Sequence, residues 1–368
     1  MNRDDAGAMF TQSWFRTAAS AGARAGTDDD EGGASMKTGL WYLPRRGSGV
    51  MAAMLLLVAA HPALAQAQAE AAPPAAERRV AITFDDLPYV HASARGEAGG
   101  ARVAADANRA IVAALKRQRV PATGFVTEQH VRALGDAGPA LLREWNQGLL
   151  ELGNHGARHA DSNGLDIDGI GREVIDGEAT IRPMVEAAGR KLRFFRFPYN
   201  HVGDTVEKRQ AAEALLARHG YRLAAATIDT SDYVFDQAYE RALKGADDWM
   251  RRRIEEAYLA HSRTQIAYYA TLDRTVLGYE PPAILLLHLN RLNAATMDRL
   301  LRLIRQQDYR FVSLDEAQSD PAYRESPRIA TKYGPMWGYR WAKERQVKVD
   351  GSKEQEPPEW VARYAEGK

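Results

Sequence analysis

The chain has 368 residues, of which 45% are hydrophobic and 26% are charged, so its length allows one large globular domain or two modest ones. Its formal net charge of +1 gives no electrostatic reason to expect a nucleic acid or a membrane surface as partner. It contains no cysteine, which excludes disulfides and thiolate zinc sites. Any bound metal must therefore be held by His, Asp or Glu side chains.

The N-terminal residues have the pattern of an export signal. Residues 36–65 combine a basic start, a short apolar run and a small-residue cleavage site that ends at Ala65, as in a signal peptide. The apolar run is shorter than the about 20 residues that span a bilayer, although a retained N-terminal anchor is the alternative. We interpret residues 1–35 as lying upstream of the true start and 66–78 as a disordered leader. The mature protein is then expected to be periplasmic or secreted, with no stable membrane span.

Beyond the leader, apolar runs of strand length alternate with amphipathic stretches of helix length. Strands are predicted over residues 80–84, 122–127, 150–154, 192–197, 222–228, 283–288 and 310–314. Helices are predicted over residues 101–119, 138–149, 167–188, 204–219, 236–264 and 293–307. Such alternation predicts a parallel sheet, either open and doubly wound or closed as a barrel. No GxGxxG or GxxxxGK motif follows any strand, which argues against a nucleotide-binding protein, and seven strands favour an incomplete barrel.

Two stretches fall outside this alternation. Residues 236–280 form a long, mainly helical insertion, in which Trp249, Ile254 and Tyr258 stand at helical spacing and are interpreted as packing residues. The tail over 319–368 is rich in Tyr, Trp and Pro, and we expect it to pack on the outside of the barrel. No second domain and no internal repeat is predicted.

The first predicted strand ends in two adjacent acids. In the stretch RRVAITFDDLP, an apolar run typical of a strand buried on both faces is followed directly by Asp85 and Asp86. Adjacent carboxylates repel each other and lose solvation on burial, unless a cation lies beside them or one carries a proton. The alternative is an acid at a helix N-cap, followed by Pro88 at an early helical position.

Further polar residues follow the other strands at the same end. They are His155 and His159 in HGARH, Arg196 and Tyr199 in RFPY, Asp229 and Asp232 in DTSD, and His288 in LLLH. In an α/β barrel the active site lies at the carboxyl ends of the strands. Each motif alone has an ordinary explanation, as a surface group, an ion pair or a core histidine. Packing is a poor explanation for all of them together.

These residue types indicate a metal-dependent hydrolase. Two imidazoles and one carboxylate are a ligand set of catalytic zinc that leaves positions open for water and substrate. Zinc acidifies its bound water and polarises a carbonyl, while a free carboxylate and a histidine can move protons. The sequence therefore predicts hydrolysis of an amide or an ester, with one of the two adjacent aspartates binding the metal and the other doing proton chemistry.

The five motifs TFDD, HGARH, RFPY, DTSDY and LLLH, in this order, resemble those of the polysaccharide deacetylases (carbohydrate esterase family 4, the NodB homology domain). The resemblance spans residues 79–318. It implies a distorted (β/α)7 barrel that uses a divalent metal, Zn²⁺ first and Co²⁺ or another ion as alternatives. The implied substrates are acetylated polysaccharides or oligosaccharides, which lose N-acetyl or O-acetyl groups.

The resemblance also implies roles for individual residues. Asp85 becomes the catalytic base and His288 the general acid, and the metal ligands are Asp86, His155 and His159.

Other residues support these groups. Arg196 holds and tunes Asp85, Asp232 pairs with His288, and the backbone N–H of Tyr199 helps to hold the oxyanion. The residues implied to contact the substrate are Leu286 in the acetyl pocket, Tyr233 and Pro198.

Three positions depart from the family pattern. Gly156 stands where Ser or Thr is usual, which predicts the loss of a hydrogen bond that braces the loop. Asn200 replaces a usual Gly, although Asn tolerates left-handed backbone angles. Tyr233 replaces a usual Trp, which changes the shape of the acetyl pocket.

Two alternative functions are left open. One is a deacetylase-like module that binds glycan with weak catalysis or none, and the other is a deformylase or esterase of small glycans. The insertion over 236–280 would close one end of the groove and so favour short substrates. The sequence leaves the glycan, the metal and the oligomeric state undetermined.

Overall fold

The computed structural model describes residues 77–92, 97–324 and 326–368. The upstream region 1–35 and the predicted signal peptide 36–65 lie outside the described residues, as does the leader up to residue 76. The first strand already begins at Arg78, inside the stretch predicted as leader.

The centre of the fold is a parallel sheet of eight strands. Their order is β5-β4-β3-β2-β1-β7-β6, and β8 pairs with the first half of β1. The strands are β1 (Arg78–Leu87), β2 (Ala122–Val126), β3 (Leu150–Asn154), β4 (Phe194–Phe195), β5 (Arg222–Leu223), β6 (Ile228–Asp229), β7 (Ala283–His288) and β8 (Tyr309–Val312).

The predicted strand over 222–228 closes the sheet into an incomplete barrel. Its first residues form β5, which pairs with β4, and its last residues form β6, which pairs with β7. The two edges of the sheet are thus one continuous stretch of chain. Between the two strands, the Ala224 N–H donates to the Phe195 carbonyl at 2.8 Å and the Thr227 N–H to the Ile284 carbonyl at 2.9 Å. With β5 and β6 counted as one strand, the seven predicted strands and the distorted (β/α)7 barrel are confirmed.

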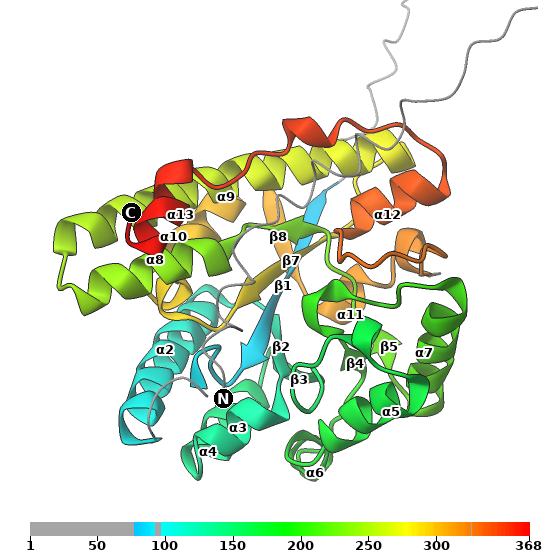
Figure 1. Cartoon of the computed structure of the whole chain (residues 1–368), viewed down its shortest axis with the longest axis horizontal. Helices are drawn as coiled ribbons and strands as arrows, with labels where there is room; N and C mark the ends of the chain where they lie inside the picture. The colour runs from blue at the N-terminus through cyan, green and yellow to red at the C-terminus, as the bar shows by residue number, and fades with distance from the viewer. Residues whose placement is uncertain (1–76, 93–96, 325) are drawn as a thin grey trace, which may run out of the picture. The chain divides into compact units, whose positions relative to one another are not determined.

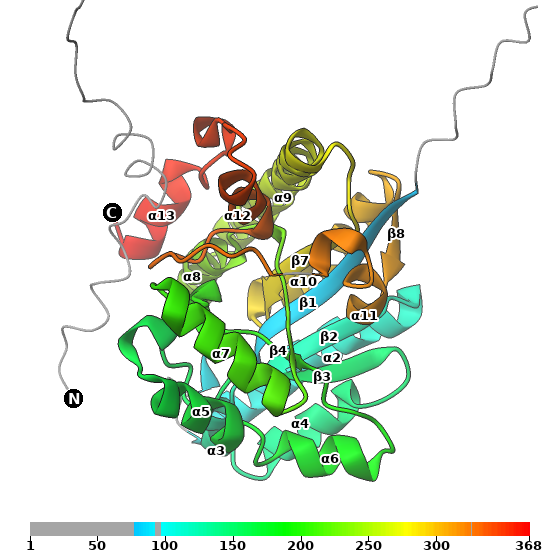
Figure 2. The ribbon, with the colours of Figure 1, turned by 90° about the vertical axis from the view of Figure 1, so that its right-hand side faces the viewer.

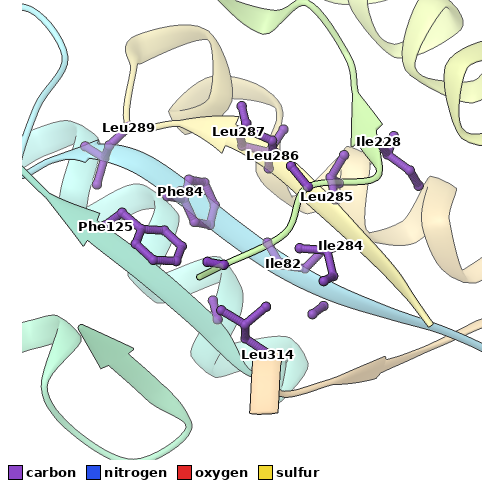
Figure 3. Close-up of a cluster of buried hydrophobic side chains, with 14 of the residues drawn as sticks. Ile82, Phe84, Phe125, Ile228, Ile284, Leu285, Leu286, Leu287, Leu289 and Leu314 are labelled. Atoms are coloured by element: carbon purple, nitrogen blue, oxygen red, sulfur yellow. The ribbon is translucent and has the colours of Figure 1, made fainter. Parts of the chain in front are cut away.

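The core lies around β1 and β7, whose apolar runs are buried on both faces. Ile82, Phe84, Ile284 and Leu285 are at most 1% exposed, and Figure 3 shows them clustered with Phe125 of the neighbouring strand. Burying each such side chain stabilises the fold by about 1.5–3 kcal/mol. This rigid pair of strands carries the acids and the histidine that end β1 and β7.

Helices connect the strands and cover the sheet. They are α2 (Glu97–Gln118), α3 (Glu128–Ala133), α4 (Ala137–Trp145), α5 (Ile167–Asp176), α6 (Ile181–Ala187), α7 (Val206–Arg218), α10 (Arg291–Arg305) and α11 (Leu314–Ala317). The predicted helix over 167–188 is two helices, because α5 ends at Asp176. Its C-cap is Gly177, where a Cβ would lie 2.6 Å from the Asn154 side chain. The short helix α3, directly after β2, is absent from the prediction.

The insertion contains two helices, α8 (Asp232–Lys244) and α9 (Asp248–Leu277). The predicted helix over 236–264 is broken at Gly245–Asp247, where Asp247 caps α9 by accepting from the Met250 N–H at 2.9 Å. In Figures 1 and 2 the C-terminal helices lie on this pair, α12 (Trp337–Glu344) against α9 and α13 (Glu359–Glu366) against α8. In the described part of the chain, no helix is both long enough and apolar enough to cross a membrane.

Candidate active site

The first of the two adjacent acids is held by a buried arginine. Arg196 Nη1 donates to Asp85 Oδ1 and to Thr83 Oγ1, both at 2.8 Å, and its Nη2 donates to the Ala225 carbonyl at 2.8 Å. Arg196 is fully buried and Asp85 is 4% exposed. Charge-assisted hydrogen bonds of this kind are strong and directional, so the Asp85 carboxylate has one fixed orientation.

The second acid faces a different group of residues. Asp86 has a φ of +63°, in the left-handed region. Its Oδ1 accepts from Thr127 Oγ1 at 3.2 Å and lies 3.5 Å from His159 Nε2. The ligand atoms of Asp86, His155 and His159 all lie within 4.8 Å of one another.

The protonation states of Asp86 and His155 suit a divalent metal. Burial lowers the pKa of His155 to about 4, so its imidazole is neutral, and its Nδ1 lies 2.8 Å from the Arg196 carbonyl. Because a carbonyl only accepts, Nδ1 carries the proton and Nε2 offers its lone pair. Burial alone would raise the pKa of Asp86, but the imidazoles of His159, His130 and His155 hold it well below its usual range. A carboxylate and neutral imidazoles are the forms that bind metals, through bonds of about 2.0–2.2 Å.

The loop that carries the two histidines is braced by Glu173 of α5. The buried Glu173 accepts at Oε2 from the N–H groups of Ala157, at 3.0 Å, and Arg158, at 2.8 Å. Gly156 has a φ of +91°, and a Cβ there would lie 3.2 Å from the same carboxylate oxygen, so the loop requires glycine. Gly156 has no hydroxyl to brace the loop, as predicted, and a carboxylate of α5 accepts from two of the loop's N–H groups instead.

The other side of the site holds a buried His–Asp pair. His288 ends β7 opposite Asp85 of β1, and its Nδ1 lies 2.7 Å from Oδ1 of the fully buried Asp232. Burial by itself would lower the pKa of His288, but the Asp232 carboxylate outweighs it and raises that pKa to about 10. The arrangement can therefore keep the imidazole protonated and present a proton donor on the strand next to that of Asp85.

The residues expected to contact the substrate lie around these groups. The Tyr199 ring is 43% exposed and 4.7 Å from the His159 ring, and Tyr233 is 44% exposed with its ring 6.0 Å from that of His288. Leu286 is 7% exposed, and Pro198 is buried at the start of the turn that carries Tyr199. The two exposed rings thus lie one beside His159 and one beside His288.

The turn at Tyr199 is held by the C-terminal extension. Tyr199 and Asn200 have φ values of +58° and +55°, so the left-handed turn persists with Asn in place of Gly. Arg340 Nη2 donates to the Asn200 carbonyl at 2.7 Å, and Gly334 passes so close that a Cβ there would lie 1.7 Å from the Tyr199 carbonyl oxygen. The extension therefore packs directly against this strained segment.

His130 is a further histidine at the site that the sequence analysis missed. It lies in the first turn of α3, with Nδ1 3.9 Å from Asp86 Oδ1, and within the described residues this buried Nδ1 has no hydrogen-bond partner. A signal for it existed, because His130 follows the second predicted strand as the other site residues follow theirs.

A second group of possible ligands lies at the insertion. His91 Nε2 is 2.8 Å from Asp236 Oδ2, and Glu240 lies nearby. Arg291 Nε donates to Glu240 Oε1 at 2.8 Å, so a guanidinium already supplies the positive charge here. We assign no metal to this cluster.

Comparison with known proteins finds a family match for the first part of the described fold. The family model described as polysaccharide deacetylase matches residues 72–223. That segment belongs to the polysaccharide deacetylase family. It contains Asp85, Asp86, the HGARH loop and Arg196, whereas Asp232 and His288 lie beyond it. No curated protein matches the chain.

Solved structures of the same family share the fold only remotely. The wild-type BA3943 protein of Bacillus anthracis, described as a CE4 family pseudoenzyme, is 17% identical, with 66% of each chain covered and a TM-score of 0.43. The peptidoglycan deacetylase PdaC of Bacillus subtilis, in a mutant form, is 18% identical over 66% of this chain and 93% of its own, with a TM-score of 0.39. The polysaccharide deacetylase Bc1974 of Bacillus cereus is 18% identical over 64% of this chain and 92% of its own, with a TM-score of 0.43.

Proposed function

We propose that the protein is a metal-dependent hydrolase that removes N-acetyl or O-acetyl groups from a cell-wall or related glycan. One observation carries the proposal. Arg196 donates to Asp85 alone of the two acids, whereas Asp86 forms one cluster with the two histidines of HGARH, of which His155 also lies 3.8 Å from Asp85. Neighbouring carboxylates with such different surroundings suit different tasks, proton transfer and metal binding.

The residues present fit a divalent ion held by Asp86, His155 and His159, which would polarise the acetyl carbonyl and acidify a water. Asp85, oriented by Arg196, accepts the proton of the water that attacks the carbonyl carbon. The backbone N–H of Tyr199 stabilises the negative charge that develops on the carbonyl oxygen.

The bond to the sugar then breaks with a proton from His288. In the N-acetyl case the carbon–nitrogen bond cleaves, and the imidazolium gives its proton to the departing amine, so that acetate and an amino sugar result. Asp232 keeps His288 in the tautomer that has Nδ1–H, which directs Nε2 toward the leaving group.

Aromatic rings at the site favour a glycan substrate. Tyr199 and Tyr233 expose their rings on two sides of the proposed reaction centre, and aromatic faces bury large apolar areas at little entropic cost. Leu286 and Pro198 offer the apolar contact that an acetyl methyl group needs.

A glycan-binding module without turnover explains less of the site. Such a module needs neither the buried Arg196–Asp85 pair nor the Asp232–His288 pair, both of which cost desolvation. The presence of both pairs favours an enzyme.

Acetate release tests the proposal. Metal-loaded protein is incubated with chitooligosaccharides, peptidoglycan fragments and acetylated xylan, before and after chelation. We expect release from at least one substrate, its loss with chelator and its recovery on adding Zn²⁺ or Co²⁺. Glycan binding without release from any substrate would favour the module instead.

We also propose that the protein acts outside the cytoplasm, on the signal-peptide pattern of residues 36–65. N-terminal sequencing of the protein from its native host checks this. A mature start near Ala65 is expected, and a retained Met36 would indicate an anchored protein.

A further inference from the structure

The Asp232 carboxylate accepts hydrogen bonds from His288 and also from two further residues. Besides Nδ1 and the backbone N–H of His288, both at 2.7 Å, it accepts from Asn290 Nδ2 at 3.1 Å and from Asn293 Nδ2. Both asparagines are buried at the start of α10. A buried carboxylate with this many donors is held in a single position.

Asn293 contacts both members of the pair. It is fully buried, and besides Asp232 its Nδ2 donates to the His288 carbonyl at 2.9 Å. Its Oδ1 accepts from the Tyr258 hydroxyl at 2.8 Å. Because that hydroxyl supplies a donor to Oδ1, the amide has only one satisfactory orientation, with Nδ2 toward the two acceptors.

Tyr258 belongs to the inserted helix α9 and has no exposed surface. Burial and the nearby Asp232 raise the pKa of Tyr258 well above its usual value, so the hydroxyl stays a donor. The sequence pattern led us to interpret Tyr258 as a packing residue. Its ring does pack, at 5.5 Å from Phe235, but its hydroxyl continues a hydrogen-bonded chain from the insertion to the His–Asp pair.

We propose that Tyr258 and Asn293 are positioning residues for the general acid. The insertion over 236–280, which carries Tyr258, then supports catalysis as well as packing on the barrel. The inference rests on the proposed hydrolase function. Asn293 fixes Asp232 and the His288 backbone relative to each other, and Tyr258 fixes the amide of Asn293. Together they hold the imidazole at the angle from which Nε2 can reach the leaving group.

The experiment compares single and double variants with a matched control. Tyr258→Phe removes one hydroxyl and should lower kcat about 3- to 10-fold, the effect of one hydrogen bond. Asn293→Leu removes three hydrogen bonds at similar volume and should lower kcat about 10- to 100-fold. In both variants KM and metal content should stay at wild-type values, because the substrate and metal contacts are untouched.

The double variant separates positioning from general damage. Since Tyr258 acts through Asn293, Tyr258→Phe in an Asn293→Leu background should cost nothing further, whereas independent structural defects add. Tyr269→Phe is the control. Tyr269 is a nearly fully buried tyrosine of the same helix, but its hydroxyl donates to Glu354 instead, so kcat should not change.

An NMR measurement that does not depend on turnover tests this inference separately from the proposed function. The proton on His288 Nδ1 should give a downfield NMR resonance in the wild type and in Tyr269→Phe. It should be shifted or lost through exchange in Asn293→Leu. An unchanged resonance in Asn293→Leu, wild-type kcat in Tyr258→Phe, or additive losses in the double variant would overturn the inference. A wild type that releases no acetate but shows these NMR differences would contradict only the hydrolase.

Discussion

Different means hold the two sides of the site, the proposed metal side with Asp86, His155 and His159 and the proposed acid side with Asp232 and His288. On the metal side, Asp86, Gly156 and His159 all have left-handed backbone angles, with φ of +63°, +91° and +57°. Short loops after β1 and β3 bring Asp86, His155 and His159 together there, and the Glu173 side chain accepts from two N–H groups of the second loop. On the acid side, Asp232 begins α8 after Ser231, whose φ is +52°, and His288 ends β7. Buried side-chain amides and a tyrosine hydroxyl hold this pair.

The two sides also lie in different segments of the sequence. The metal side lies within residues 72–223, the segment that matches the family model. The acid side lies beyond that segment and depends on the insertion. Damage on the metal side should therefore change metal content and affinity, and damage on the acid side should change the rate and its pH dependence while the metal stays.

The largest expected effect concerns Asp85, which lies between the two sides. Asp85→Asn keeps the size of the side chain and an acceptor for Arg196, but cannot take up a proton at neutral pH. We expect kcat to fall by about 10²–10⁴, the usual contribution of general acid–base catalysis, at full metal occupancy. Acetate-release kinetics with parallel metal analysis measure this, and a variant with more than a tenth of wild-type kcat would show that Asp85 is not the base.

A smaller effect is expected on the metal side from the bracing of the histidine loop. Glu173→Ala removes the acceptor of the Ala157 and Arg158 N–H groups and should weaken metal binding about 10- to 100-fold, as loss of groups that support metal ligands does. Competition with a chelator measures the dissociation constant. Asp176→Ala is the control, an exposed acid of the same helix, and should bind metal as the wild type does. Equal affinities in both variants would mean that Glu173 does not hold the ligands.

The smallest effect on the rate is expected on the acid side, from removing the charge of Asp232. His288 must be protonated to act, and Asp232 raises its pKa to about 10. Asp232→Asn removes that negative charge, so the pKa falls toward the ordinary histidine value of about 6.5 and activity is lost at lower pH than in the wild type. The alkaline limb of the pH–rate profile should move down, with little change at pH values below both pKa values. An alkaline limb that stays in place would remove Asp232 from this role.

How much of this the sequence could predict depends on where each residue lies. The strand-end residues Asp85, His155, Arg196 and His288 were predictable, because the carboxyl ends of parallel strands meet at one rim. His130 obeys the same rule, but the sequence analysis overlooked the short helix α3 that carries it directly after β2.

The supporting residues could not be predicted in this way. Glu173, Tyr258 and Asn293 stand at ordinary positions within helices, and local sequence does not tell which loop or partner a helix face will meet. The break of the insertion at Gly245–Asp247 was missed for a related reason, since a single glycine within a helical pattern is often tolerated. Tertiary packing, which single-sequence patterns do not contain, decides each of these cases.

The separate roles of the two adjacent acids can be measured directly. Metal stoichiometry is determined on purified wild type, Asp86→Ala and Asp85→Asn, loaded with Zn²⁺ and passed through the same desalting step, with acetate release followed on each. We predict bound metal in the wild type and in Asp85→Asn, and its loss from Asp86→Ala, which retains only the two imidazoles of His155 and His159. Stoichiometric metal and wild-type acetate release in both variants would contradict the metal-hydrolase mechanism and leave the paired acids with a structural role alone.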